Sequence, residues 1–178
     1  MTFGTTPNLE QMADRLAIEE ILHLHCRGVD RAEAADLKAA YWPEAEVAYG
    51  SFNGRAHEFC ELLPQGIVRY QATHHQISNV LIEQREADAV VESYVTAYHF
   101  SPEGANTEMT YVGRYVDHFQ KRTDQWKILY RNVVMDWNQH LTASADFDSP
   151  TFAGLQRSGR KPDDPLYQLK HDLFGEAS

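Results

Sequence analysis

The spacing of apolar residues changes from a helical to a strand period partway along the chain. In the first third, apolar side chains recur every three to four residues, and Asn8 precedes the first such run as a plausible N-cap. Pro43 forbids continuation of a second, shorter helix. The expected elements are helices over 8–29, 30–41 and 56–68, with a short strand over 46–49.

From residue 73 onward the period is two. Long runs rich in Val, Ile, Tyr and Thr alternate with turn signals, which is typical of strands. Short connections between them favour an antiparallel meander. The expected strands cover 73–83, 89–100, 109–120 and 126–139. Helices followed by strands indicate an α+β fold, in which the helices cover the inner face of the sheet and leave a pocket between the layers.

Beyond residue 141 the chain becomes polar and rich in Pro and Gly. We therefore expect one domain over 1–140 and a C-terminal arm over 141–178. Residues 166–174 are apolar enough to dock a last helical turn. The arm is long enough to close either its own pocket or that of a neighbouring subunit.

Composition and charge narrow the class of partner. The chain is 43% hydrophobic and 24% charged, which is ordinary for a globular protein. A formal net charge of -10 argues against nucleic acid and anionic membranes, and no stretch approaches the roughly 20 apolar residues of a membrane helix. Two cysteines and the lack of a secretory signal pattern favour a reduced, cytoplasmic protein. A hydrophobic small molecule is the expected partner.

Polar side chains on otherwise apolar strand faces are the candidates for chemistry. Arg131 lies in such a row, and a buried guanidinium needs a carboxylate, a ligand oxygen or water. It could pair with an internal acid, lie at an oligomer contact or face a ligand. His75 shares a face with apolar residues and Asn79, which fits either a hydrogen-bonded core histidine or a base. His99 lies in a similar row and could serve as well.

Asp30, at the junction of the first two expected helices, also has two interpretations. It could cap the second helix, or it could accept the ring N–H of a histidine and make the other ring nitrogen a better base. Either His23 or His25 could accompany it, and spacing does not choose between them. No histidine or cysteine spacing typical of a metal site occurs, and no Gly-rich nucleotide motif, so we expect neither a metal nor a cofactor.

Several short motifs follow one another along the chain in an order that resembles that of a known protein family. They are Val29-Asp30, the turn Phe52-Asn53-Gly54, the run THHQISN over 73–79, DQWKI over 124–128 and RNVVMDW over 131–137. Together, over about residues 8–140, they resemble the SnoaL-like branch of the nuclear-transport-factor-2-like superfamily. Hexachlorocyclohexane dehydrochlorinase, scytalone dehydratase and bile-acid 7α-dehydratase belong to that branch.

The resemblance implies a cone-shaped, cystatin-like α+β barrel, in which a curved, mostly antiparallel sheet wraps around three N-terminal helices. It also implies an Asp–His dyad in an enclosed pocket and no cofactor. The dyad falls on Asp30 and His75, and Arg131 matches the arginine of the last strand. Tyr49 matches a pocket tyrosine, and His25 stands where relatives have Tyr or Lys. Substrate-binding positions are then expected at Asn79, Trp42, Tyr111, His99 and Met135.

These observations predict a cofactor-independent lyase, of the dehydratase or dehydrohalogenase type, acting on a hydrophobic cyclic or steroid-like molecule. An isomerase or polyketide-cyclase-like enzyme of the same fold would chiefly use an acidic residue as base and release no water. A non-catalytic binding module or oxygenase small subunit would show no turnover alone. Apolar residues on both faces of the last strand indicate a homo-oligomer, with a trimer favoured and a dimer as the alternative.

Overall fold

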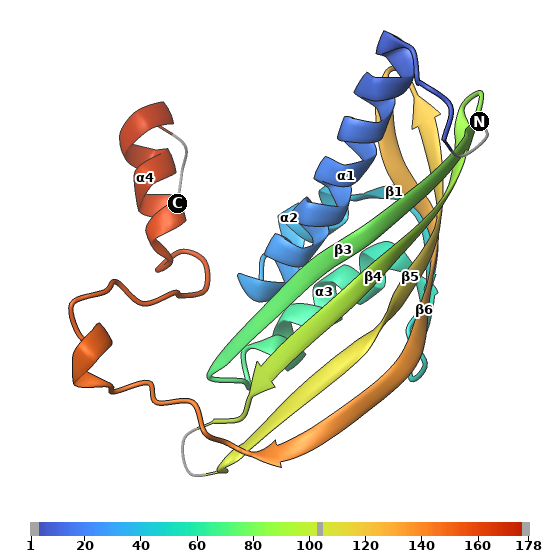
Figure 1. Cartoon of the computed structure of the whole chain (residues 1–178). Helices are drawn as coiled ribbons and strands as arrows, with labels where there is room; N and C mark the ends of the chain where they lie inside the picture. The colour runs from blue at the N-terminus through green and yellow to red at the C-terminus, as the bar shows by residue number, and fades with distance from the viewer. Residues whose placement is uncertain (1–3, 103–104, 176–178) are drawn as a thin grey trace.

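The computed structural model describes residues 4–102 and 105–175 (Figure 1). Its α-helices are α1 (Leu9–Asp30), α2 (Ala34–Ala39), α3 (Ala56–Ile67) and α4 (Pro165–Phe174), with a 3-10 turn at Pro150–Phe152. Its strands are β1 (Tyr41–Ala48), β2 (Asn53–Arg55), β3 (Ala72–Arg85), β4 (Asp88–Phe100), β5 (Thr107–Arg122) and β6 (Gln125–Thr142). The helix-then-strand order expected from the sequence is confirmed.

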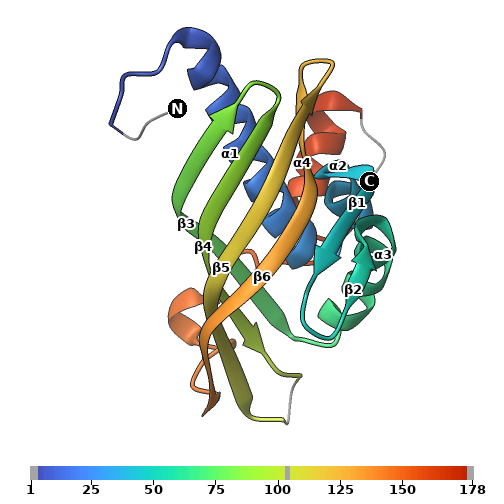
Figure 2. The same ribbon diagram turned by 90° about the vertical axis from the view of Figure 1, so that its right-hand side faces the viewer.

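The strands form one curved sheet in the order β2-β1-β6-β5-β4-β3. β3 to β6 are an antiparallel meander, as predicted, and β1 joins it parallel to β6. Helices α1 to α3 lie against one face, while Figure 2 shows the opposite face of the sheet uncovered by α1, α2 or α3. The sheet stays open, with β2 and β3 as its edges, so the cystatin-like α+β class is confirmed but the expected barrel is not closed.

The first helix forms where its sequence pattern predicts. Asn8 accepts from the main-chain N–H of Gln11, whose side chain in turn accepts from the N–H of Asn8, a reciprocal capping arrangement. Ile18, Leu22 and Val29 fall on one stripe and are buried against the sheet. The helix continues to Asp30, which places this carboxylate at its C-terminal end.

The second helix differs from the expectation. Glu33, and not Asp30, caps α2 by accepting from the N–H of Ala35. The helix ends at Ala39, and Tyr41 already belongs to β1. Pro43 lies inside β1, where the pairing with β6 is irregular, so its missing N–H costs no ladder hydrogen bond.

β-bulges in β3 and β6 change which residues face the helices. Leu129 is an extra residue in β6, so that Ile128 and Arg131 are both fully buried on the inner face, although alternation alone places them on opposite faces. In β3, the register shifts between Ser78 and Leu81, and Asn79 adopts a positive φ of 47°. Asn79 is therefore exposed and no longer shares the face of His75.

The segment after β6, residues 143–175, returns to the end of α1. The N–H of Lys161 donates to the carbonyl of Arg31, and the side chain of Arg31 forms an ion pair with Asp164. Asp164 also caps α4, in which Tyr167 is buried. The expected helical turn over 166–174 is thus part of α4, while the division into a domain and an arm remains a prediction.

Within the described part of the chain, no helix is long and apolar enough to cross a membrane. The outer sheet face carries partly exposed apolar residues, including Tyr94, Tyr98 and Tyr130. Self-association through such a surface remains a prediction.

Candidate active site

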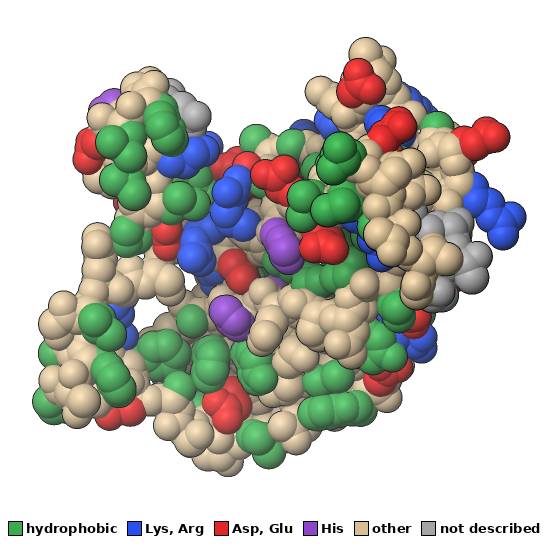
Figure 3. All heavy atoms as spheres, turned by 45° about the horizontal axis from the view of Figure 1, so that its top comes forward, with side chains coloured by type: hydrophobic (Ala, Val, Ile, Leu, Met, Phe, Trp, Pro, Cys, Tyr) green, Lys and Arg blue, Asp and Glu red, His purple; other side chains and the backbone are tan. Residues whose placement is uncertain are grey.

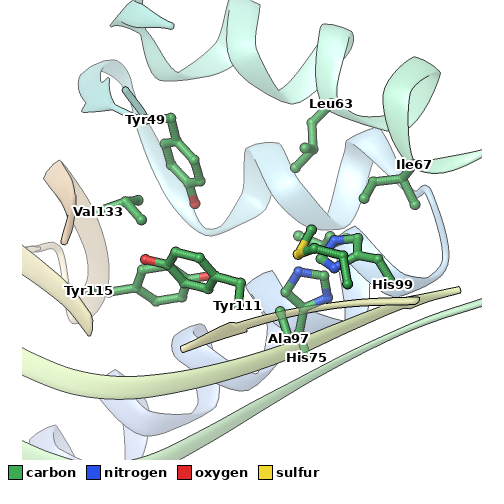
Figure 4. Close-up of a pocket in the computed structure, with 11 residues that line it drawn as sticks. Tyr49, Leu63, Ile67, His75, Ala97, His99, Tyr111, Tyr115 and Val133 are labelled. Carbon is green, nitrogen blue, oxygen red and sulfur yellow. The ribbon is translucent and has the colours of Figure 1, made fainter. Parts of the chain in front are cut away.

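A pocket of about 280 Å³ lies between the inner face of the sheet and the helices. Leu63 and Ile67 of α3 face it from one side, and side chains of β3 to β6 form the other (Figure 4). Figure 3 shows a hollow between the C-terminal segment and the body, where histidine, acidic and basic side chains gather. The lining residues are Val29, Tyr49, Leu63, Ile67, His75, Ala97, His99, Met109, Tyr111, Tyr115 and Val133.

Asp30 and His75 meet at the edge of this pocket. One carboxylate oxygen of Asp30 lies 2.7 Å from Nδ1 of His75, and the other accepts the main-chain N–H of His75 at 2.9 Å. A carboxylate only accepts hydrogen bonds, so Nδ1 carries the ring proton and Nε2 carries the lone pair. Nε2 makes no hydrogen bond within the described residues, and the ring lines the pocket. The pair can therefore offer a basic nitrogen to a ligand.

His99 lies beside His75, with ring centroids 5.2 Å apart in an edge-to-face arrangement. Burial, followed by the neighbouring His75, lowers the pKa of His99 to about 4. Its Nδ1 is buried without a hydrogen-bond partner in the described structure. His99 is thus a neutral pocket wall near pH 7, and a weaker proton acceptor than its sequence position alone indicates.

His25 is fully buried between two tyrosine hydroxyls. Tyr49 lies 3.1 Å from its Nε2, and Tyr41 lies 3.3 Å from its Nδ1. Burial, and then the charge of Arg131, hold the pKa of His25 well below its usual value, so the ring is neutral and has one proton. The single ring proton lies on one of the two nitrogens, so the ring donates to one tyrosine hydroxyl and accepts from the other. In the tautomer with the proton on Nε2, the ring donates to Tyr49 and accepts from Tyr41.

That tautomer leaves the phenolic proton of Tyr49 for the pocket. Burial raises the pKa of Tyr49, which keeps its hydroxyl protonated. Tyr111 differs, because its hydroxyl donates to the carbonyl of Val134 at 2.9 Å, and burial raises its pKa to about 12. Tyr49 is therefore a pocket hydroxyl that can donate to a ligand in that tautomer. His23 is exposed on α1, away from this chain of hydrogen bonds.

Arg131 is fully buried and pairs with Asp117 of β5, not with Asp30. Its Nε and Nη2 donate to the two carboxylate oxygens of Asp117 at 2.8 and 2.7 Å. The guanidinium also lies 4.0 Å from the ring centroid of Tyr115. Burial disfavours the charge, yet Asp117 raises the pKa of Arg131 well above its usual value. The two opposite charges compensate each other beside the pocket. Of the alternatives considered for Arg131, the structure therefore shows the pairing with an internal acid.

Three expected substrate-binding residues do not line the pocket. Trp42 donates to the carbonyl of Gln120 and lies under the guanidinium of Arg122. Asn79 is turned outward by the bulge in β3. Met135 is 58% exposed on β6. His99 and Tyr111 do line it, as expected.

The sequence reasoning missed Met109, Tyr115 and Val133 as lining residues and Asp117 as the partner of Arg131. Strict alternation along β5 provides the signal, because Tyr115 and Asp117 fall in the same row as Tyr111. Among the described residues, no cluster of three or more histidine, cysteine or acidic side chains could hold a metal ion.

An open, curved sheet over helices, with a pocket between the two layers, defines the class of small cystatin-like α+β domains. The sequence profile of the SnoaL-like domain matches residues 10–132, and the chain belongs to that family. The family resemblance of the motifs is thereby confirmed. No curated protein matches the chain in sequence.

Solved structures share the fold. A scytalone-dehydratase-like protein of Novosphingobium aromaticivorans is 24% identical, with a TM-score of 0.66 over 75% of this chain and 91% of that one. A type 3 hexachlorocyclohexane dehydrochlorinase of Novosphingobium barchaimii is 23% identical, with a TM-score of 0.70 over 81% and 100%. At this level of identity the likeness concerns the fold, and activity has to be argued from the site.

Proposed function

We propose that the chain is a cofactor-independent lyase that removes a carbon-bound proton from a neutral, hydrophobic, cyclic small molecule. The observation that carries this proposal is the Asp30–His75 pair, whose Nε2 faces a mostly apolar pocket. Similar folds in a dehydrochlorinase and a scytalone-dehydratase-like protein support elimination as the reaction type.

In the proposed reaction, the substrate proton moves to Nε2 of His75 and the C–H electron pair becomes the new double bond. Asp30 orients the imidazole and stabilises the imidazolium that forms. The bond to the leaving group breaks, and the hydroxyl of Tyr49 donates a hydrogen bond to the departing oxygen or halide. A departing hydroxide takes the proton that His75 removed and leaves as water, whereas a chloride leaves as the ion and the proton passes from His75 to solvent. Both groups that act on the substrate are side chains of this chain.

The pocket favours a neutral ligand. The charge of Arg131 is compensated by Asp117, and the lining itself is apolar, aromatic or histidine. A charged ligand would lose its hydration without gaining a partner ion. Hydroxylated ring ketones, hydroxysteroids and halogenated rings are therefore the classes to assay.

The alternative of an isomerase with a carboxylate base is less well supported. Both carboxylate oxygens of Asp30 already accept hydrogen bonds from His75, so this acid is poorly placed to take a proton itself. A non-catalytic binding module would keep the same pair only as structural support. Product mass separates elimination from isomerisation, because elimination releases water or hydrogen halide and isomerisation releases nothing. A binding module would give no product.

The test is turnover of hydroxysteroids, hydroxylated ring ketones and hexachlorocyclohexane by His75→Ala and Asp30→Asn. We expect a loss of about 10²–10⁴-fold in each variant, because positioned bases typically contribute that much. His74→Ala is the matched control, since His74 is the neighbouring residue and is exposed on the outer face. Full turnover in both His75→Ala and Asp30→Asn would remove the mechanism.

A further inference from the structure

The segment after β6 brings a guanidinium to the ends of α1 and β3. Nη1 of Arg160 donates to the main-chain carbonyl of Asp30 and, at 3.1 Å, to the hydroxyl of Thr73. Nη2 lies 3.4 Å from the carbonyl of Ile67 and 3.3 Å from that of Tyr70. One side chain thus joins the end of α1, the start of β3 and the connection between α3 and β3.

The residues around Arg160 hold it in this place. On one side, the N–H of Gly159 donates to Asp164 at 2.9 Å. On the other side, the main-chain N–H of Lys161 donates to the carbonyl of Arg31, and the ammonium of Lys161 lies 2.7 Å from the carboxylate of Glu33. The segment is therefore attached to the chain on both flanks of Arg160, immediately beyond the end of α1.

The carbonyl that Arg160 binds belongs to the proposed dyad. Asp30 ends α1, and the last carbonyls of a helix have no partner inside the helix and carry partial negative charge. Burial lowers the pKa of Arg160, and the charge of Asp30 opposes that shift. Thr73, the other Nη1 acceptor, lies two residues before His75 on the same face of β3. Arg160 therefore contacts the two segments that carry the carboxylate and the imidazole.

We propose that Arg160 is a positioning residue that fixes Asp30 against β3 and so holds the carboxylate and the His75 ring at hydrogen-bond distance. The inference rests on the proposed function of that pair. The family match ends at residue 132, so Arg160 is supplied by a part of the chain outside the matched family domain. The C-terminal segment is then a component of the site.

The first test uses the ligand-free protein. The Nδ1 proton of His75, held by Asp30, should give a far-downfield proton resonance, assigned by its loss in Asp30→Asn. Arg160→Ala is expected to lose or broaden this resonance, and Arg160→Lys to restore part of it. Arg157→Ala is the control, because Arg157 belongs to the same segment but its side chain is 56% exposed and, among the described residues, pairs with Asp148 at 3.3 Å. The His75 resonance of the Arg157→Ala variant should match that of the unsubstituted protein.

The second test is turnover of whichever assayed ring compound the unsubstituted protein converts. Arg160→Ala should lower kcat by up to about 100-fold, since misplacement by about 1 Å costs that much, with little change in KM. Added guanidinium ions should recover part of the loss in Arg160→Ala but not in Asp30→Asn. Thermal unfolding of each variant separates loss of fold from loss of position.

The proposal is overturned if folded Arg160→Ala keeps the His75 resonance, or if it unfolds at lower temperature but retains full kcat. Absence of turnover in the unsubstituted protein would instead overturn the proposed function. The resonance needs no substrate, so it would still decide whether Arg160 positions the pair.

Discussion

The hydroxyl of Tyr49 lies 3.1 Å from Nε2 of His25, a histidine that solvent does not reach. We propose that Tyr41 donates to the other ring nitrogen, Nδ1, so that Nε2–H donates to Tyr49 and the Tyr49 proton is left for the pocket. In this arrangement the buried, neutral ring of His25 sets the direction in which the Tyr49 hydroxyl donates its proton. The two tyrosines should consequently respond differently to loss of their hydroxyls.

Tyr49→Phe should lower kcat on a hydroxylated ring ketone by about 10²-fold, because one donor to the departing group is lost. Tyr41→Phe should instead lower the free energy of unfolding by about 1–3 kcal/mol, since a buried acceptor on His25 loses its partner. Steady-state kinetics and urea unfolding of both variants measure the two effects. A larger kinetic loss in Tyr41→Phe than in Tyr49→Phe would contradict the proposed direction.

The buried histidines predict a specific dependence of stability on pH. His99 has a folded pKa of about 4, whereas an unfolded histidine has a pKa of about 6.5. Between pH 4 and 6.5 the unfolded chain binds more protons than the folded chain. The contribution of His99 to the free energy of unfolding is therefore complete above pH 6.5 and is lost as the pH falls toward 4. The loss is up to about 3 kcal/mol. His25, whose pKa is also lowered, acts in the same direction.

Urea unfolding at several pH values checks this dependence. His99→Gln should flatten the decline between pH 6.5 and 4, because no titrating ring remains at that position. His23→Gln, at an exposed position of α1, is the control and should leave the decline as it is. An equal slope in the His99→Gln variant would show that His99 is not the source.

Asp117→Asn should be severely destabilising. It leaves the charge of Arg131 buried without its carboxylate, which costs about 3–5 kcal/mol in the free energy of unfolding. Glu92→Gln breaks a partly exposed pair with Arg114 and should cost less than about 1 kcal/mol. Chemical denaturation of both variants gives the comparison, and similar losses in the two would refute the argument.

Gly113→Ala should disrupt the pocket through backbone contact. An added Cβ would lie 2.2 Å from the carbonyl oxygen of Val134 and 2.4 Å from the hydroxyl of Tyr111, so Tyr111 must lose its hydrogen bond or the strands must separate. Gly66→Ala in α3 meets nothing within 4 Å and should stabilise by about 0.4–1 kcal/mol. The midpoint temperature of thermal unfolding should fall in Gly113→Ala and rise in Gly66→Ala.

Local sequence was sufficient for much of the fold because its long strands alternate over most of their length and clear turns separate them. It was insufficient around Tyr41, where the residues continue a helical pattern but the chain pairs with β6, 87 positions away at Ile128. Such non-local parallel pairing has no local signal.

The candidate site shows the same division. Asp30 and His75 were paired through the family resemblance, since the residues alone left each with a structural alternative, and the structure brings them together. Asn79 was misplaced because a bulge interrupts the alternation on which its position was inferred. Arg160 could not have been selected, since nothing in a polar segment with several basic residues distinguishes the one that reaches back to α1.

The extra residue at Leu129 sets the phase of the last strand. Before it, even-numbered residues such as Ile128 face the helices, and between it and a second register shift at Asp136 odd-numbered residues such as Arg131 do. Removing or adding one position here would rotate every later side chain to the opposite side and separate Arg131 from Asp117. Evolution along this strand should therefore tolerate many replacements at 129 but strongly resist any change in the number of residues.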